Sequence, residues 1–118
     1  MGKIFMVIDS GMKGGITVVD ESGEITVSCS MPVLKVNGRQ KLDCDEIIAL
    51  VEKINNTNGF IYIEQQHSRP TDGKRSMNTH LINYGILVGI LEGLKAQYVI
   101  VSPVWQKYMH NCDVIKKE

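Results

Sequence analysis

Two short apolar segments, KIFMVID at residues 3–9 and FIYIE at residues 60–64, decide how this chain is built. Both are rich in β-branched and aromatic residues, and each ends in an acid, Asp9 or Glu64. Such short, nearly continuous apolar runs are typical of strands in the interior of a sheet. We therefore expect two strands, the first of them buried on both faces.

Turn residues and periodicity define the other elements. Residues 10–15 and 20–24 contain glycine and predict tight turns, so the strands at 16–19 and 25–30 form an antiparallel meander with the first. Residues 31–42 include Pro32 and Gly38 and are expected to be irregular. The remaining expected elements are a helix capped by Asp43 and Glu46 that ends at 55–59, a loop at 65–75, a helix at 77–95, a strand at 97–101 and a helix opened by Pro103.

This order, β-β-β-α-β-α-β-α, predicts a single α/β domain over residues 1–118. Right-handed crossovers place the strands at 60–64 and 97–101 parallel to the first strand, on the side away from the meander. The expected sheet is mixed, five-stranded and ordered 3-2-1-4-5, with helices on its faces. That arrangement is the ribonuclease H-like fold.

The composition is that of an ordinary globular protein, and the net charge is zero. No bulk positive field therefore attracts polyanions, and a nucleic-acid partner would need a local patch. No apolar run approaches the ~20 residues of a membrane span, no P-loop motif occurs, and the three histidines lack zinc spacing. Cys29, Cys44 and Cys112 are odd in number, which favours free thiols in a reducing cytoplasm.

Asp9 and Glu64 form the pair with the clearest chemical meaning. If their strands are parallel neighbours, both carboxylates lie at the carboxyl edge of the sheet, where open α/β sheets bind ligands. Adjacent carboxylates repel unless a cation lies between them, and oxygen ligands suit Mg²⁺ or Mn²⁺. Such a site can activate water for attack on a phosphodiester. The alternative is that each acid only ends its strand and faces water.

The segments IDSGMKGGITVVD, IEQQHSRPTDGKRSMNTHLINYGILVGILEGL and YVIVSPVWQK resemble the RuvC family of Holliday-junction resolvases, and the phage-type members in particular through Glu64, His67 and Pro70. The resemblance implies metal-dependent cleavage of four-way or branched DNA, with Asp9 and Glu64 as catalytic metal ligands. It also implies two more carboxylates on a last helix. This chain departs from that pattern: it ends at Glu118 and shows no acid-rich final helix, so we expect an incomplete site and weak cleavage.

Residues 65–75 carry His67, Arg69, Lys74 and Arg75 against one acid, Asp72. This is the positive patch beside the proposed site, so we expect it to contact DNA phosphates. In the bacterial members an aromatic residue near this point meets the DNA, which suggests the same for His67. The alternative is an ordinary solvated loop.

Gly85, Gly89 and Gly93 form a stripe of small residues along the helix at 77–95. Glycine disfavours a helix by ~1 kcal/mol relative to alanine, so we expect close backbone packing, either on the sheet or on the same helix of a second copy. Met77, Leu81, Tyr84 and Val88 are expected in the core. A resolvase of a two-fold symmetric junction is expected to be a homodimer.

Two other functions remain open. A non-catalytic junction-binding or scaffold protein would keep the fold with an incomplete site. A nucleotide-binding lobe of the actin and sugar-kinase type also begins with an apolar strand and D-x-G, but it needs a second lobe for which 118 residues leave no room.

Overall fold

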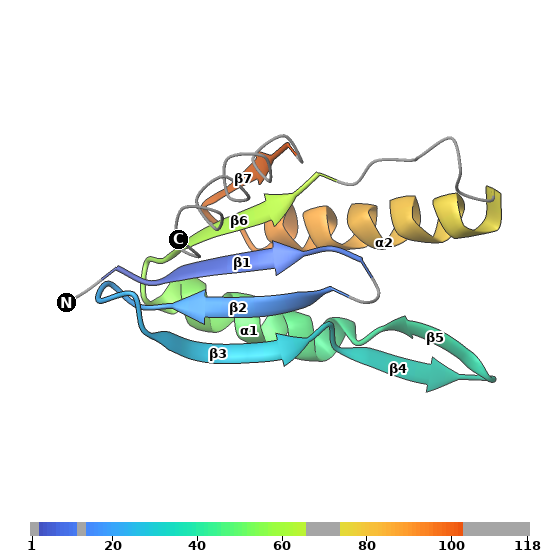
Figure 1. The fold of residues 1–118 in the computed structure, drawn as a ribbon, viewed down its shortest axis with the longest axis horizontal. Coiled ribbons are helices and arrows are strands. Elements are labelled where there is room, and N and C mark those ends of the chain that lie inside the picture. The colour runs from blue at the N-terminus through green and yellow to red at the C-terminus, as the bar shows by residue number, and fades with distance from the viewer. Residues whose placement is uncertain (1–2, 12–13, 66–73, 103–118) are drawn as a thin grey trace, which may run out of the picture.

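The computed structural model describes residues 3–11, 14–65 and 74–102, with the side chains of 74–77 left aside. Its main sheet has five strands in the order β3-β2-β1-β6-β7 (Figure 1). These strands are β1 (Phe5–Asp9), β2 (Gly15–Val19), β3 (Ile25–Ser30), β6 (Phe60–Glu64) and β7 (Tyr98–Val101). β2 is antiparallel to β1 and β3, whereas β6 is parallel to β1 and β7. The predicted strand order and directions are confirmed.

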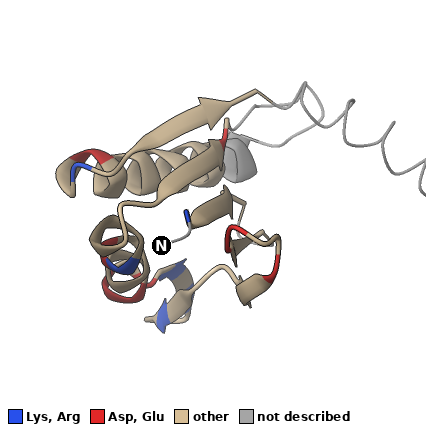
Figure 2. Ribbon diagram, turned by 90° about the vertical axis from the view of Figure 1, so that its left-hand side faces the viewer, with Lys and Arg blue, Asp and Glu red and all other residues tan. Residues whose placement is uncertain are grey.

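Two helices, α1 (Cys44–Asn56) and α2 (Lys74–Gly93), pack on the same side of the sheet (Figure 2). The core lies in this layer. Met6, Ile8, Ile61 and Ile63 point into it from β1 and β6 and are at most 1% exposed. The helices contribute residues at helical spacing, namely Ile47, Val51, Ile54, Leu87 and Leu91. The opposite side, which faces the viewer in Figure 1, is called the open face below.

Polar contacts fix the helices at their ends. The backbone N–H of Glu46 donates to Oδ1 of Asp43 at 3.3 Å, so the predicted cap of α1 is confirmed. Asn55 donates its side-chain amide to the carbonyl of Leu94 at 3.0 Å, which joins the end of α1 to the end of α2. These bonds hold both helices at a defined position along the strands.

The expectation that β1 is buried on both faces is wrong. Met6 and Ile8 are buried against the helices, but Val7 is 38% exposed and Asp9 is exposed on the open face. A sheet with helices on one side only gives this alternation. The apolar residues at both parities concealed it in the sequence.

Residues 31–42 are not irregular. They contain a hairpin of β4 (Val33–Val36) and β5 (Arg39–Leu42), paired from Val33↔Leu42 to Val36↔Arg39. Asn37 and Gly38 connect the strands, both with positive φ, at 53° and 77°. Two left-handed residues in a two-residue loop make the type I′ turn that Asn-Gly favours. The Asn-Gly dipeptide was the signal for this hairpin, and Pro32 precedes the strand without interrupting it.

Helix α2 begins at Lys74, three residues before the predicted start, because Lys, Arg and Ser are compatible with its first turn. Its buried side is Asn83, Leu87 and Leu91, with Tyr84 and Val88 half-buried. Leu81 was expected in the core but is 46% exposed, since it lies about 160° around the helix from Leu87. No helix in the described part of the chain is long and apolar enough to cross a membrane.

Cys29 and Cys44 are free thiols, as expected. Cys112 and the predicted helix after Pro103 lie outside the described residues, so both stay predictions.

Candidate metal centre at the carboxyl edge of the sheet

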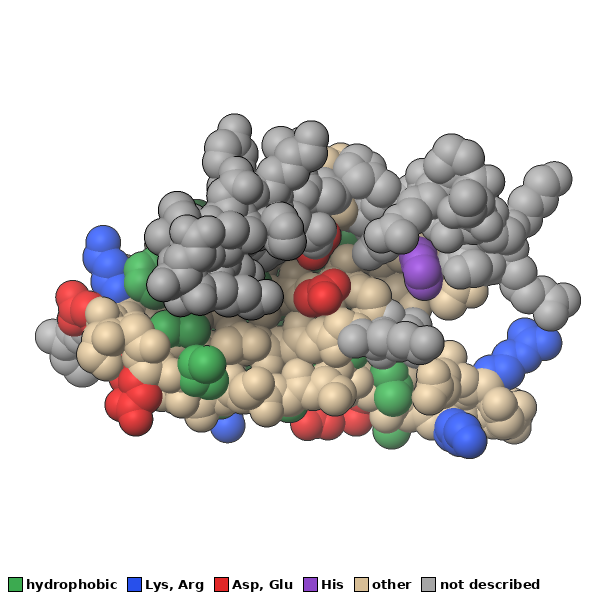
Figure 3. All heavy atoms as spheres, in the orientation of Figure 1, with side chains coloured by type: hydrophobic (Ala, Val, Ile, Leu, Met, Phe, Trp, Pro, Cys, Tyr) green, Lys and Arg blue, Asp and Glu red, His purple; other side chains and the backbone are tan. Residues whose placement is uncertain are grey.

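Asp9 and Glu64 end two neighbouring parallel strands. The residues before them, Ile8 and Ile63, are paired in register and both point into the core. Because side chains alternate along a strand, Asp9 and Glu64 both point to the open face, side by side at the carboxyl edge. Asp9 is exposed and Glu64 is half-buried. Acidic side chains lie in the middle of this face in Figure 3.

The backbone around this pair is closely held. Ser10 is 1% exposed, and its hydroxyl donates to the carbonyl of Glu64 at 3.4 Å, which joins the ends of β1 and β6. The N–H of Gln65 donates to the carbonyl of Val101 at 2.8 Å and joins β6 to β7. The two carboxylates therefore project from an ordered sheet edge.

Gly14 supports Asp9 from the other side. A Cβ on Gly14 would overlap the Asp9 carbonyl and lie 2.9 Å from its carboxyl carbon. The Gly14 N–H donates to the Gly11 carbonyl at 2.9 Å, and its own carbonyl accepts from Met31 N–H at 3.1 Å. Only glycine fits this close approach to Asp9.

The donor set suits a hard divalent cation. Mg²⁺ is commonly held by one or two carboxylates, with waters and substrate phosphate as the other ligands. Among the residues that the structure describes, no group of three or more His, Cys, Asp or Glu side chains could hold a metal together. Asp9 and Glu64 thus fit one such ion but not a complete protein cage.

Asp20 does not belong to this site. It follows β2 at the opposite edge of the sheet, where its Oδ1 accepts from Ser22 N–H, Ser22 Oγ–H and Glu24 N–H at 2.9, 2.6 and 3.0 Å. The hydrogen bond from the Ser22 hydroxyl, followed by that from Glu24 N–H, lowers the pKa of Asp20 below 3.8. This carboxylate organises a turn.

The other predicted site residues are placed only in part. Lys74 and Arg75 form the start of α2, not a loop. His67 and Arg69 lie outside the described residues, as do the acids Asp113 and Glu118. Their proximity to the carboxylates stays a prediction.

The glycines of α2 do not pack on the sheet. Gly85, Gly89 and Gly93 are exposed, and an added Cβ at each would meet no atom within 4 Å beyond the helix's own backbone. Ile82 and Ile86 lie on the same outward side and are 62% and 36% exposed. Of the two expected packing partners, the sheet is excluded.

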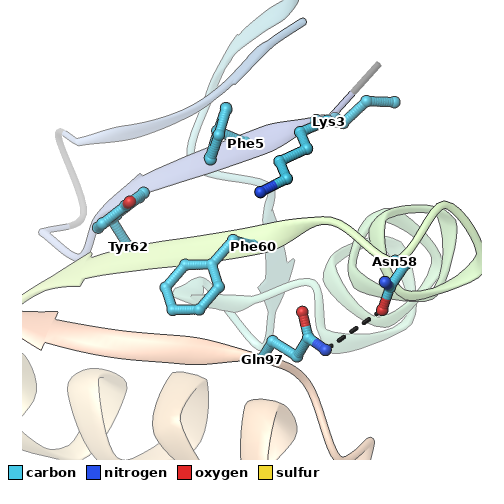
Figure 4. Close-up of a pocket in the computed structure, with 7 residues that line it drawn as sticks. Lys3, Phe5, Asn58, Phe60, Tyr62 and Gln97 are labelled. Atoms are coloured by element: carbon cyan, nitrogen blue, oxygen red, sulfur yellow. Dashed lines mark hydrogen bonds between the residues drawn. The ribbon is translucent and has the colours of Figure 1, made fainter. Parts of the chain in front are cut away.

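A separate cavity of about 230 Å³ opens at the amino ends of β1 and β6 (Figure 4). It is lined by Lys3, Ile4, Phe5, Asn58, Phe60, Tyr62 and Gln97. Gln97 donates its amide to Asn58 Oδ1 at 3.2 Å, and the Phe60 and Tyr62 ring centroids are 5.3 Å apart. Since Asp9 and Glu64 end these strands, the cavity lies at the opposite end from them.

Two comparisons found no match, and one found the fold. No protein-family model and no curated protein sequence matches this chain. Among solved structures, RuvC from T. thermophilus in complex with a Holliday junction substrate is similar, with a TM-score of 0.60 and 13% identity over 86% of this chain and 66% of that one. Another T. thermophilus RuvC structure has a TM-score of 0.43 and 16% identity over 85% of this chain and 64% of its own.

The chain thus spans slightly less than two thirds of those RuvC chains. At this identity the comparison concerns the fold alone. The mixed five-stranded sheet and its two helices give this chain the α/β, ribonuclease H-like fold that RuvC also has.

Proposed function

We propose that this protein is a metal-dependent endonuclease that cleaves four-way (Holliday) or similarly branched DNA. The observation that carries the proposal is the pairing of Asp9 with Glu64 at the carboxyl edge of parallel β1 and β6. The shared fold with a RuvC that is bound to a Holliday junction supports the substrate class. We further propose a phage-type member that acts in the cytoplasm of a bacterial or phage-infected cell.

In this proposal Asp9 and Glu64 are the catalytic metal ligands for Mg²⁺ or Mn²⁺. A divalent ion bound there supplies a Lewis acid for the phosphoryl oxygen and lowers the pKa of water. The two carboxylates orient the ion, and Gly14 leaves room for Asp9 to keep its position. His67, Arg69, Lys74 and Arg75 are the proposed DNA contacts next to this edge.

The test is cleavage of a synthetic four-way junction in Mg²⁺ or Mn²⁺. Asp9→Asn and Glu64→Gln remove the charge with little change in size, and each should abolish metal-dependent cleavage. Asp20→Asn removes the same charge at the opposite edge and should cleave as the parent does. An Asp9→Asn protein that cleaves as fast as the parent would end the proposal.

A non-catalytic junction-binding protein is the second candidate. The observation in its favour is that the described residues offer only two clustered carboxylates, fewer than a two-ion clamp needs. We therefore expect slow cleavage by the 118-residue chain, and faster cleavage after fusion of a helix that carries further carboxylates. Tight junction binding with no cleavage under any divalent ion would select the second candidate.

We also propose a homodimer formed through the outward side of α2. Two exposed isoleucines, Ile82 and Ile86, flank three glycines that let another backbone approach closely. A two-fold dimer would present two sites to the two strands of a junction. Ile82→Lys should leave the monomer folded and abolish dimers in sedimentation, and a parent that stays monomeric at high concentration would contradict this arrangement.

A further inference from the structure

The β4–β5 hairpin extends past the carboxyl edge of the main sheet (Figure 1). This is the edge at which β1 and β6 end in Asp9 and Glu64. Four residues per strand at ~3.4 Å each give the hairpin a reach of about 14 Å. A long molecule bound over the two carboxylates would therefore meet the hairpin.

The hairpin is fixed at its base and exposed toward its tip. Leu42 is 2% exposed within the core, and Asp43 N–H donates to the Pro32 carbonyl at 2.9 Å, which continues the ladder below the first pair. Beyond this base, every residue from Leu34 to Lys41 is exposed. An anchored base and the type I′ turn make the arm stiff, which lowers the entropy cost of binding.

Its charge has one sign. Residues 33–42 contain Lys35, Arg39 and Lys41 and no acid, in a chain whose net charge is zero. None of these cations forms an ion pair with a residue that the structure describes. The acids Asp43, Asp45 and Glu46 follow at the base, where they start α1. Lys and Arg side chains lie over the outer part of the hairpin in Figure 3.

The pairing register distributes these cations over both faces of the ribbon. Arg39 lies opposite Val36 and Lys41 opposite Leu34, so these four residues share one face, while Lys35 and Gln40 share the other. Leu34 and Val36 are each 45% exposed. A two-stranded ribbon fits the DNA major groove, which is about 12 Å wide, and cations on both faces then meet the phosphates of both strands.

We propose that the β4–β5 hairpin is a DNA-binding arm that grips the phosphate backbone of a duplex arm next to the Asp9–Glu64 edge. The inference rests on the proposed function, because it assumes that the edge acts on DNA. It adds three contacts, Lys35, Arg39 and Lys41, that the sequence did not identify.

The test compares two triple variants of equal charge. Lys35→Gln, Arg39→Gln and Lys41→Gln remove the hairpin cations. Lys3→Gln, Lys53→Gln and Lys95→Gln remove three exposed cations at the opposite edge, near the starts of β1 and β7 and the end of α1. Binding of the parent and both triples to a labelled four-way junction and to a linear duplex is measured without divalent ion between 50 and 200 mM salt.

Each phosphate contact contributes about 0.9 to the slope of log K against log salt. The hairpin triple should lose up to about 2.7 from the slope, and its affinity should fall about eight-fold per contact at 0.1 M salt, for both DNAs. The opposite-edge triple should bind as the parent does. The swaps Lys35→Arg, Arg39→Lys and Lys41→Arg keep the charge and should keep the slope.

The outcomes separate the two proposals. If the parent binds the junction and both glutamine triples weaken it equally, the hairpin is not the contact, and the proposed function stands. If the charge-retaining swaps bind as poorly as the glutamine triple, charge is not the cause and the inference is overturned. If the parent binds neither DNA, both proposals are wrong.

Discussion

Replacing Gly14 with alanine should destabilise the protein and disturb Asp9 together. The added Cβ would overlap the Asp9 carbonyl oxygen and lie 2.8 Å from its carbonyl carbon and 2.9 Å from its carboxyl carbon. These are mostly backbone atoms, which cannot rotate away as a side chain could. Gly14 itself is held by hydrogen bonds to Gly11 and Met31, so it cannot retreat either.

Overpacking of this kind typically costs about 1–3 kcal/mol. At roughly 4 °C per kcal/mol for a chain of this size, the melting temperature should fall by about 4–12 °C. Gly89→Ala is the matched control, because its Cβ enters open space in the middle of α2. That change should stabilise the monomer by about 0.5–1 kcal/mol, since alanine is the better helix former.

Thermal unfolding at low protein concentration, with and without Mn²⁺, measures both effects. An ion that binds only the folded state raises the melting temperature in proportion to its affinity. The Gly14→Ala protein should show a smaller Mn²⁺ response than the parent, and Gly89→Ala an unchanged one. A Gly14→Ala protein as stable as the parent would refute the steric reasoning, and a full Mn²⁺ response would show that Asp9 has not moved.

Three further substitutions test the core and a turn. Leu87→Ala, at a position only 1% exposed, should cost about 2–5 kcal/mol in urea unfolding. Asn83 is 7% exposed, and none of the hydrogen bonds among the described residues involves its side chain, so Asn83→Leu should raise stability by about 1–2 kcal/mol. The bond from Ser22 lowers the pKa of Asp20, so its stabilising effect is complete above pH 3.8 and is lost as the pH falls through the lowered value. The stability difference between the parent and Asp20→Ala should therefore shrink in acid, whereas Glu21→Ala should show no such trend.

The sheet could be predicted because its rules are topological. Tight turns made the first three strands antiparallel neighbours, and right-handed crossovers placed residues 60–64 and 97–101 on the other side of β1. Once β1 and β6 are parallel neighbours, Asp9 and Glu64 must share an edge. The candidate site followed from two strand predictions and not from any motif.

Features that depend on side-chain environment were harder to predict. Every residue of β1 before Asp9 is apolar, so the sequence does not reveal which face is covered. In α2 the apolar residues lie all around the helix, and the buried side includes the polar Asn83 while Leu81 is exposed. The β4–β5 hairpin was missed for a different reason, since Pro32 outweighed the Asn37-Gly38 turn signal.

The parallel pairing of β1 with β6 also has a consequence for how the protein folds. The β1–β2–β3 meander and the β4–β5 hairpin close over a few residues, whereas the bond from Ser10 to Glu64 spans 54 positions of the chain. Contacts of long sequence separation cost the most loop-closure entropy and limit folding rates. Asp9 and Glu64 therefore meet only after the crossover through α1 has closed, and divalent-ion binding at their edge would report the late steps of folding.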